Sequence, residues 1–121
     1  MATTPMTLFA GLCADLPPPA LAELRTAVQA HYAELVAAQA KDELIAVDLA
    51  ELLATHLDTL LASAHLFTAD ARADLVGAAR YFISDKDTIP DLKPCTGLDD
   101  DVQVFNHVAR ALGRPDLVIT E

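Results

Sequence analysis

The chain has 121 residues, of which 53% are hydrophobic and 5% aromatic, and it contains no tryptophan. Acidic residues outnumber basic ones by 18 to 8, which gives a formal net charge of −10 at pH 7. One domain is expected at this length, and the apolar content argues against a disordered chain. The acidic balance argues against nucleic acid as a partner, because binding phosphates needs a basic surface.

Alanine and leucine dominate the composition, and both favour helices, whereas β-branched residues are comparatively few. We therefore expect an all-α fold: a compact single-domain bundle of about five helices over residues 1–121. The most apolar stretch, residues 44–67, carries Asp48, Glu51 and Asp58, and charges at those positions argue against a membrane span. The N-terminus lacks the basic region of an export signal. These features predict a cytoplasmic protein with Cys13 and Cys95 as free thiols.

The first half of the chain predicts three helices. Leucines spaced four apart from Leu8 to Leu16 predict a short helix over 7–15, ended by the prolines at 17–19. Proline is tolerated at a helix start, so a second helix is expected over 19–40 and a third over 43–64. Their apolar stripes are Leu21, Leu24, Val28, Leu35 and Val36, then Ile45, Leu49, Leu52, Leu53, Leu57, Leu60 and Leu61. No glycine or proline separates these two helices, so one long bent helix is the alternative.

The second half predicts two more helices. Thr68 is a good N-cap for a helix over 69–83, and Gly77 inside it either permits a close helix crossing or is merely tolerated. Two prolines and a glycine interrupt the segment that follows, which forms a loop containing Ile-Pro-Asp. The last helix is expected over 98–112, ended by Gly113, and the tail 114–121 is expected to extend over the surface.

The stretch 81–112 carries the most specific pattern in the sequence. It has the order S-x-x-D-x-I-P-D, then P-x-x-G-x-x-D-D, and then an apolar helix. The residues in those positions are Ser84, Asp87, Ile89, Pro90, Asp91, Pro94, Gly97, Asp100 and Asp101. This stretch resembles the YkvA-like family (domain of unknown function 1232). The resemblance implies a helical fold and implies membrane association for many relatives, and it brings no established catalytic activity.

Six aspartates fall between residues 85 and 101, and three interpretations of them remain open. The favoured one is structural, since aspartates cap turns and are stabilised at the start of a helix. The second is a site for Ca²⁺ or Mg²⁺, whose candidate ligands are Asp87, Asp91, Asp100 and Asp101. The third is an acidic patch that binds a partner. The segment lacks the ligand spacing of an EF-hand, and no cofactor is expected.

Motifs for catalysis are not apparent: the sequence has no HExxH, no G-x-S-x-G and no glycine-rich phosphate loop. The leading hypothesis is therefore a non-catalytic helical interaction or regulatory module. It would bind a protein partner, basic in charge, through a helix-lined groove or an acidic rim. The first alternative is peripheral membrane association through an apolar face such as Leu8, Phe9 and Leu12. The second is a metal-dependent hydrolase that uses the acidic loop. The oligomeric state is open.

Overall fold

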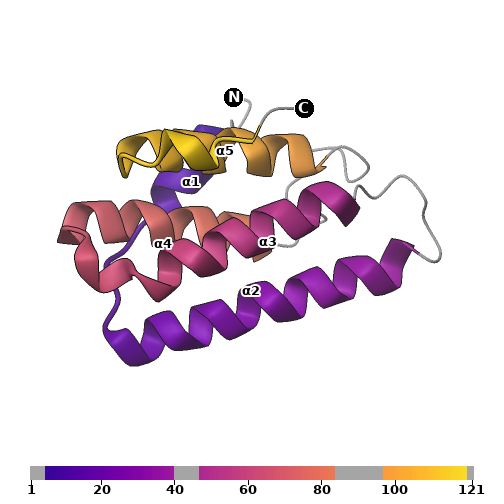
Figure 1. Ribbon diagram of the computed structural model, residues 1–121, viewed down its shortest axis with the longest axis horizontal. Coiled ribbons are helices and arrows are strands. Elements are labelled where there is room, and N and C mark those ends of the chain that lie inside the picture. Colours follow the sequence, from indigo (N-terminus) through magenta and orange to yellow (C-terminus); the bar gives the residue numbers. More distant parts are fainter. Residues whose placement is uncertain (1–4, 40–46, 84–96, 120–121) are drawn as a thin grey trace.

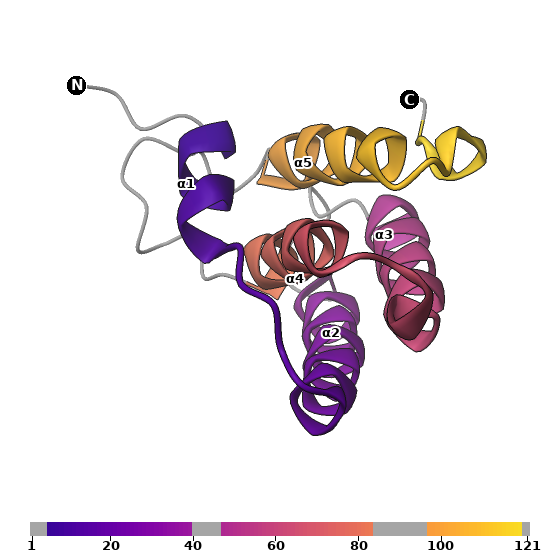
Figure 2. The same cartoon turned by 90° about the vertical axis from the view of Figure 1, so that its left-hand side faces the viewer.

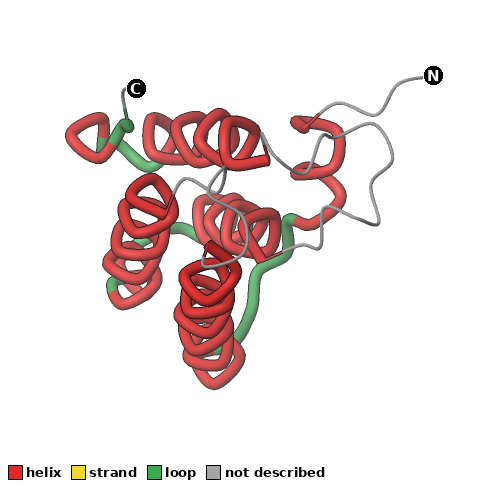
Figure 3. Tube along the Cα trace, turned by 90° about the vertical axis from the view of Figure 1, so that its right-hand side faces the viewer, coloured by secondary structure: helices red, strands yellow, loops and turns green. Residues whose placement is uncertain are grey.

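The computed structural model describes residues 5–39, 47–83 and 97–119 (Figure 1). These ranges contain helices, turns and connectors, without a strand, so the all-α prediction is confirmed (Figure 3). Two of the elements are short 3₁₀ turns, labelled η. The elements in chain order are α1 (Pro5–Leu12), α2 (Pro18–Gln39), α3 (Val47–Ala62), η1 (Ala64–Leu66), α4 (Ala69–Ile83), α5 (Gly97–Ala111) and η4 (Pro115–Leu117).

Helix α4 lies at the centre of the bundle. Viewed roughly along its axis, α4 is surrounded by α1, α2, α3 and α5 (Figure 2), and it packs against all four. Its central position requires apolar or small residues around most of its circumference. Its buried residues are Leu75, Val76, Gly77, Ala78, Ala79, Tyr81 and Phe82. Because the other helices each have a solvent side, they are the candidates for binding surfaces.

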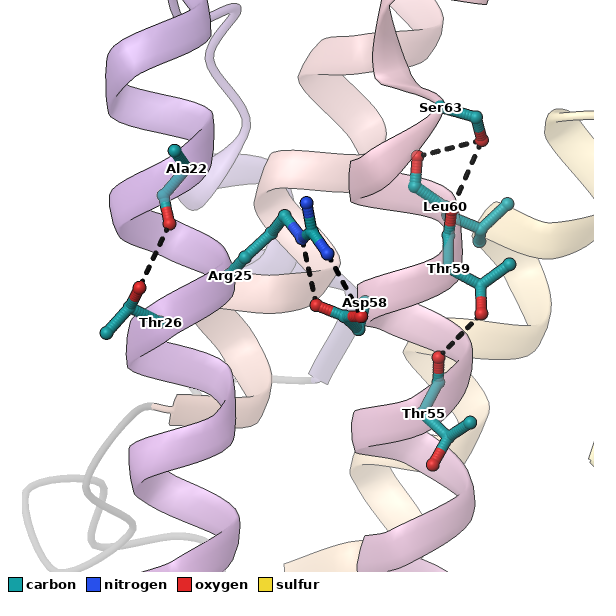
Figure 4. Close-up of polar contacts among 8 residues, drawn as sticks. All are labelled: Ala22, Arg25, Thr26, Thr55, Asp58, Thr59, Leu60 and Ser63. Atoms are coloured by element: carbon teal, nitrogen blue, oxygen red, sulfur yellow. Dashed lines mark hydrogen bonds and ion pairs between the residues drawn. The ribbon is translucent and has the colours of Figure 1, made fainter.

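Helices α2 and α3 run in opposite directions and lie side by side (Figure 1). They are therefore two helices, and the alternative of one long bent helix is wrong. An ion pair joins them: Arg25 Nε donates to Asp58 Oδ1 at 2.9 Å, and Arg25 Nη2 donates to Asp58 Oδ2 at 3.3 Å (Figure 4). Apolar burial along the seam is the main source of stability, and the partly exposed ion pair adds little to it.

The first helix differs from its predicted range of 7–15. Helix α1 ends at Leu12, where Arg80 Nη1 of α4 donates a hydrogen bond of 3.1 Å to the Leu12 carbonyl. The carbonyl groups at a helix end need partners from outside the helix, and here a distant side chain supplies one. Beyond α1, Arg72 holds Asp15 through a two-point contact whose shorter bond is 2.9 Å. The leucine spacing continues to Leu16, but these contacts with α4 hold the chain after Leu12 outside the helix.

The other predicted helix ends agree more closely with the structure. Helix α4 begins one residue after Thr68, whose Oγ accepts a 3.2 Å hydrogen bond from the Ala71 amide, as expected of an N-cap. Helix α3 ends at Ala62 rather than at residue 64. Gly113 has φ +75°, which favours glycine, and it follows the end of α5.

The tail forms a turn rather than the expected extended segment. After η4, the side-chain amide of Asn106 on α5 bonds the backbone of Ile119 twice. Asn106 Nδ2 donates to the Ile119 carbonyl at 2.9 Å, and the Ile119 amide donates to Asn106 Oδ1 at 2.8 Å. The Ile119 side chain is buried in the core. The described part of the tail thereby becomes an integral part of the bundle.

Candidate functional site

Most of the family-like motif lies outside the described residues. This applies to Ser84, Asp87, Ile89, Pro90, Asp91 and Pro94, and it also applies to Cys95. The remaining three residues lie at the start of α5, where Gly97 is the first residue and Asp100 and Asp101 follow. The location of these two aspartates near a helix N-terminus agrees with the structural interpretation, because the helix dipole favours negative charge there.

Asp101 differs from an ordinary surface acid. It is only 3% exposed and is therefore a buried acid. A buried carboxylate contributes nothing to an acidic rim on the surface, so the third interpretation of the loop does not extend to this residue. Within the described part of the chain, no three His, Cys, Asp or Glu residues gather as metal ligands do. Since Asp87 and Asp91 lie outside that part, the metal site stays a prediction.

The apolar face suggested for membrane contact is used inside the fold. Phe9 is buried, with its ring edge-on to His107 at a centroid distance of 5.8 Å. Leu8 and Leu12 are partly buried and pack against the same core. These three residues therefore do not form an exposed apolar face. None of the described helices combines the length and the apolar character needed to cross a membrane.

A long surface of α2 faces solvent and carries no charge, and we call it the uncharged strip. It consists of Ala22, Thr26, Gln29, Ala30, Ala33, Val36 and Ala37, all of which are exposed. Val36 was expected to point inward with Leu35. A helix turns about 100° per residue, however, and the burial of Leu21, Leu24 and Val28 places Val36 outside the core-facing arc, where it is 42% exposed. Sequence reasoning missed this strip because small residues such as alanine give no clear hydrophobic period.

Acidic side chains border the uncharged strip. On α2, Glu23 and Glu34 are exposed along one side. On α3, Asp48 and Glu51 are exposed, and Leu52 is 44% exposed beside them rather than facing inward as expected. Together, α2 and α3 contain five acidic residues and one basic residue, Arg25. The exposed charged side chains of this helix pair are therefore mainly acidic.

At one end of the α2–α3 seam lies a pocket of about 590 Å³, which we call the arginine pocket. Its walls come from the connector before α2, from α2 itself, from the end of α3 with η1, and from α4. Leu16, Leu21 and Leu61 supply apolar wall, and Arg25 and Arg72 supply positive charge. A smaller pocket, lined by Thr26 and Gln29 among others, continues along the seam.

Both arginines of this pocket already hold a carboxylate. Arg72 donates to Asp15 and also, through Nη1, to the Phe67 carbonyl at 2.6 Å. The hydrogen bond from Arg72 is the main reason that the pKa of the Asp15 carboxyl lies below its usual value. Arg25 of α2 forms its ion pair with Asp58 of α3, across the α2–α3 seam. Four separate segments contribute to the pocket, so no local sequence motif could have predicted it.

Cys13 lies between α1 and α4 as a free thiol. Its Sγ donates to the Phe9 carbonyl at 3.3 Å and lies 3.9 Å from Asp74 Oδ1. Burial, followed by the charge of Asp74 and the hydrogen bond to it, raises the pKa of the Cys13 thiol to about 11. Because the thiolate is the reactive form, this cysteine is not an activated nucleophile at neutral pH.

We expect Cys13 to react slowly with iodoacetamide at pH 8 and to gain reactivity only as the pH approaches 11. The measurement is the alkylation rate followed by mass spectrometry in a Cys95→Ser background, so that one thiol is observed. Asp74→Asn removes the negative charge and should increase the rate at pH 8. The folded-state pKa exceeds the unfolded value, so the thiol's contribution to stability is present below pH 9 and is lost as the pH rises towards 11. Rapid alkylation at pH 7 in the folded protein would contradict this account.

Comparison of the chain with family models, curated proteins and solved structures finds no match. The resemblance to the YkvA-like family therefore stays a prediction. What the fold and its surfaces define is a small all-α domain with two distinguishing features. These are the acid-bordered uncharged strip on α2 and the arginine pocket at the end of the α2–α3 seam.

Proposed function

We propose that this protein is a non-catalytic interaction module that binds a helix of a basic protein partner along the outer side of α2 and α3. The observation that carries the proposal is the uncharged strip, which extends along α2 and includes the exposed Val36. The solvent face of a helix in a globular domain is ordinarily charged and polar. A helix face whose seven exposed residues carry no charge is instead suited to packing against another helix.

The dimensions of the strip suit a partner helix. Helix α2 has 22 residues, which corresponds to about 33 Å of length, and it lies at the edge of the bundle (Figure 1). Small side chains such as Ala22 and Ala33 permit the interaxial distance of roughly 8–10 Å that packed helices adopt. A partner helix lying over the α2–α3 seam would bury the strip and bring its own edges close to Glu23, Glu34 and Glu51.

The acidic border supports a basic partner. Opposite charge at the rim of an interface increases the association rate and disfavours partners of the wrong sign. The net charge of −10 extends this attraction over the whole molecule, and salt screens it. We therefore expect a partner helix with apolar residues on one face and Lys or Arg on its flanks.

The proposal is tested with two amphipathic helical peptides of matched length, one built from Leu and Lys and the other from Leu and Glu. Fluorescence anisotropy should show binding of the Lys peptide, weakening with salt, and little binding of the Glu peptide. Ala33→Arg places a long cation in the middle of the strip and should weaken binding of the Lys peptide about tenfold or more. Ala111→Arg is the matched control, because it makes the same change at an exposed alanine of α5.

Backbone NMR shifts then locate the bound peptide. Perturbations centred on α2 and α3 support the proposal. Equal loss of affinity in Ala33→Arg and Ala111→Arg would show that only net charge matters, and perturbations centred on α5 would show that the strip is not the binding surface. Either result overturns the proposal.

A further inference from the structure

The arginine pocket has a charge that differs from that of the rest of the molecule. Of the eight basic residues in the chain, Arg25 and Arg72 both line it, and the exposed His65 lies beside them. Among the described residues, Asp15 is the acid in its lining, and Asp58 pairs with Arg25 beside it. A concave, partly apolar site with converging basic groups is a typical place for an anionic small molecule. Because Asp58 and Asp15 balance the charges of the two arginines, an anion would be recognised through the arginine N–H donors that the ion pairs leave unused.

Arg25 has hydrogen-bond donors that the ion pair with Asp58 does not use. A guanidinium group carries five N–H donors in a planar fork. Asp58 occupies Nε and one N–H of Nη2, which is the side edge of the fork. Figure 4 shows that Nη1 points away from Asp58, along the seam towards the end of α3 at Ser63. The pocket lies at that end, since Ala62 and Ala64 line it.

The unused edge, formed by Nη1 and the second N–H of Nη2, matches the two oxygens of a carboxylate. A group bound there would lie on the pocket side of Arg25, and Arg72 and His65 are the other basic groups of the lining. A doubly charged phosphate fits less well, because Asp15 also lines the pocket and Arg25 offers one free edge. Beyond the charged groups, Leu16, Leu21 and Leu61 provide apolar wall for a hydrocarbon chain.

We propose that the arginine pocket binds a small amphipathic monocarboxylate. Its carboxylate is held by the free edge of Arg25, and its hydrocarbon part lies against the three leucines. The volume of about 590 Å³ falls within the usual range of ligand pockets. The pocket shares Ala22 with the uncharged strip, but it recognises a different kind of ligand, and the proposal does not depend on the proposed function.

Octanoate is the probe that tests this site, with octylammonium and inorganic phosphate as comparison ligands. Isothermal titration calorimetry should show binding of octanoate and weaker or undetectable binding of both comparison ligands. Arg25→Gln keeps a hydrogen-bonding side chain near Asp58 but removes the charged fork, and it should weaken octanoate binding about tenfold. Arg25→Lys should give an intermediate loss, because a lysine retains the charge without the planar fork. Ala62→Trp, which fills the pocket from an exposed position, should also weaken binding.

Arg114→Gln is the matched control. Arg114 forms the same two-point contact with a carboxylate, that of Asp116, but it lies in the C-terminal segment outside the pocket. This variant has the same net charge as Arg25→Gln and should bind octanoate with unchanged affinity. The melting temperature of each variant, measured without ligand, confirms that the fold is retained.

Three results would overturn the proposal. The first is the absence of octanoate binding up to about 10 mM. At that concentration octanoate would nearly saturate a site whose dissociation constant is about 1 mM. The second is equal binding of octylammonium, which would show hydrophobic association without recognition of the carboxylate. The third is an equal loss of affinity in Arg25→Gln and Arg114→Gln, which would show that only net charge matters.

Discussion

Leu53→Ala is expected to lower the free energy of unfolding by about 2–5 kcal/mol. Leu53 lies on α3 and is completely buried in the core. Shortening it removes apolar contacts and leaves a cavity that the surrounding helices fill only in part. For a domain of this size, each kcal/mol corresponds to a change in melting temperature of roughly 3–6 °C. Urea denaturation followed by circular dichroism measures the effect directly.

The neighbouring Leu52 is the control for this prediction. It has the same side chain and lies on the same helix, but it is 44% exposed. Leu52→Ala should therefore change the free energy of unfolding by less than about 1 kcal/mol. Losses of similar size in the two variants would mean that the orientation of α3 differs from the one described.

Gly77→Val is expected to destabilise the fold by about 2–4 kcal/mol, and Gly77→Ala by about 1 kcal/mol. At this position α1 crosses α4 so closely that an added Cβ would lie 2.5 Å from Cys13 Sγ and 2.9 Å from Phe9 Cε1. Alanine is the better helix former by roughly 1 kcal/mol, so overpacking must exceed that gain for a net loss. Valine adds two more methyl groups to a contact that is already too short.

Gly11→Ala is the control for glycine substitution. Gly11 also lies in a helix, α1, but an added Cβ there would meet nothing within 4 Å. We therefore expect a small gain in stability of about 0.5 kcal/mol from helix propensity alone. Opposite signs for Gly11→Ala and Gly77→Ala would establish that the contact between α1 and α4, rather than glycine itself, determines the effect.

A double-mutant cycle identifies the atom responsible. Cys13→Ala removes the Sγ that lies nearest to the added Cβ, so Gly77→Ala should cost less in the Cys13→Ala background than in the wild type. The contact with Phe9 remains, which is why we expect a partial rather than a full rescue. Strict additivity of the two substitutions would contradict the packing described for this crossing.

The helix over residues 69–83 shows what local sequence can predict. Its start depends on a hydrogen bond between Thr68 and an amide three residues later, and its bounds were predicted correctly. Gly113 likewise marks the end of α5 through its own backbone angle. Such signals lie within a few residues of the feature that they control, and for that reason they can be read from the sequence.

The candidate sites depended on contacts between distant residues. The two arginines of the pocket pair with Asp15 and with Asp58, and no pattern along the chain indicates either pair. The uncharged strip was missed for a related reason. The apolar stripe predicted for α2 correctly included Leu21 and Val28, but the position of α3 and α4 determined that Val36 lies in solvent.

By itself, the sequence determined the all-α fold class, the helix-forming segments and the acidic charge, because composition, capping residues and hydrophobic period act locally. Tertiary structure alone decided where α1 ends, why glycine is favoured at position 77 and which face of α2 remains uncovered. Each of those outcomes depends on what packs against a residue from elsewhere in the chain, such as Arg80 at the end of α1 or Cys13 over Gly77. Burial and close contact are properties of the assembled bundle, and they set the surfaces on which the two proposed binding sites lie.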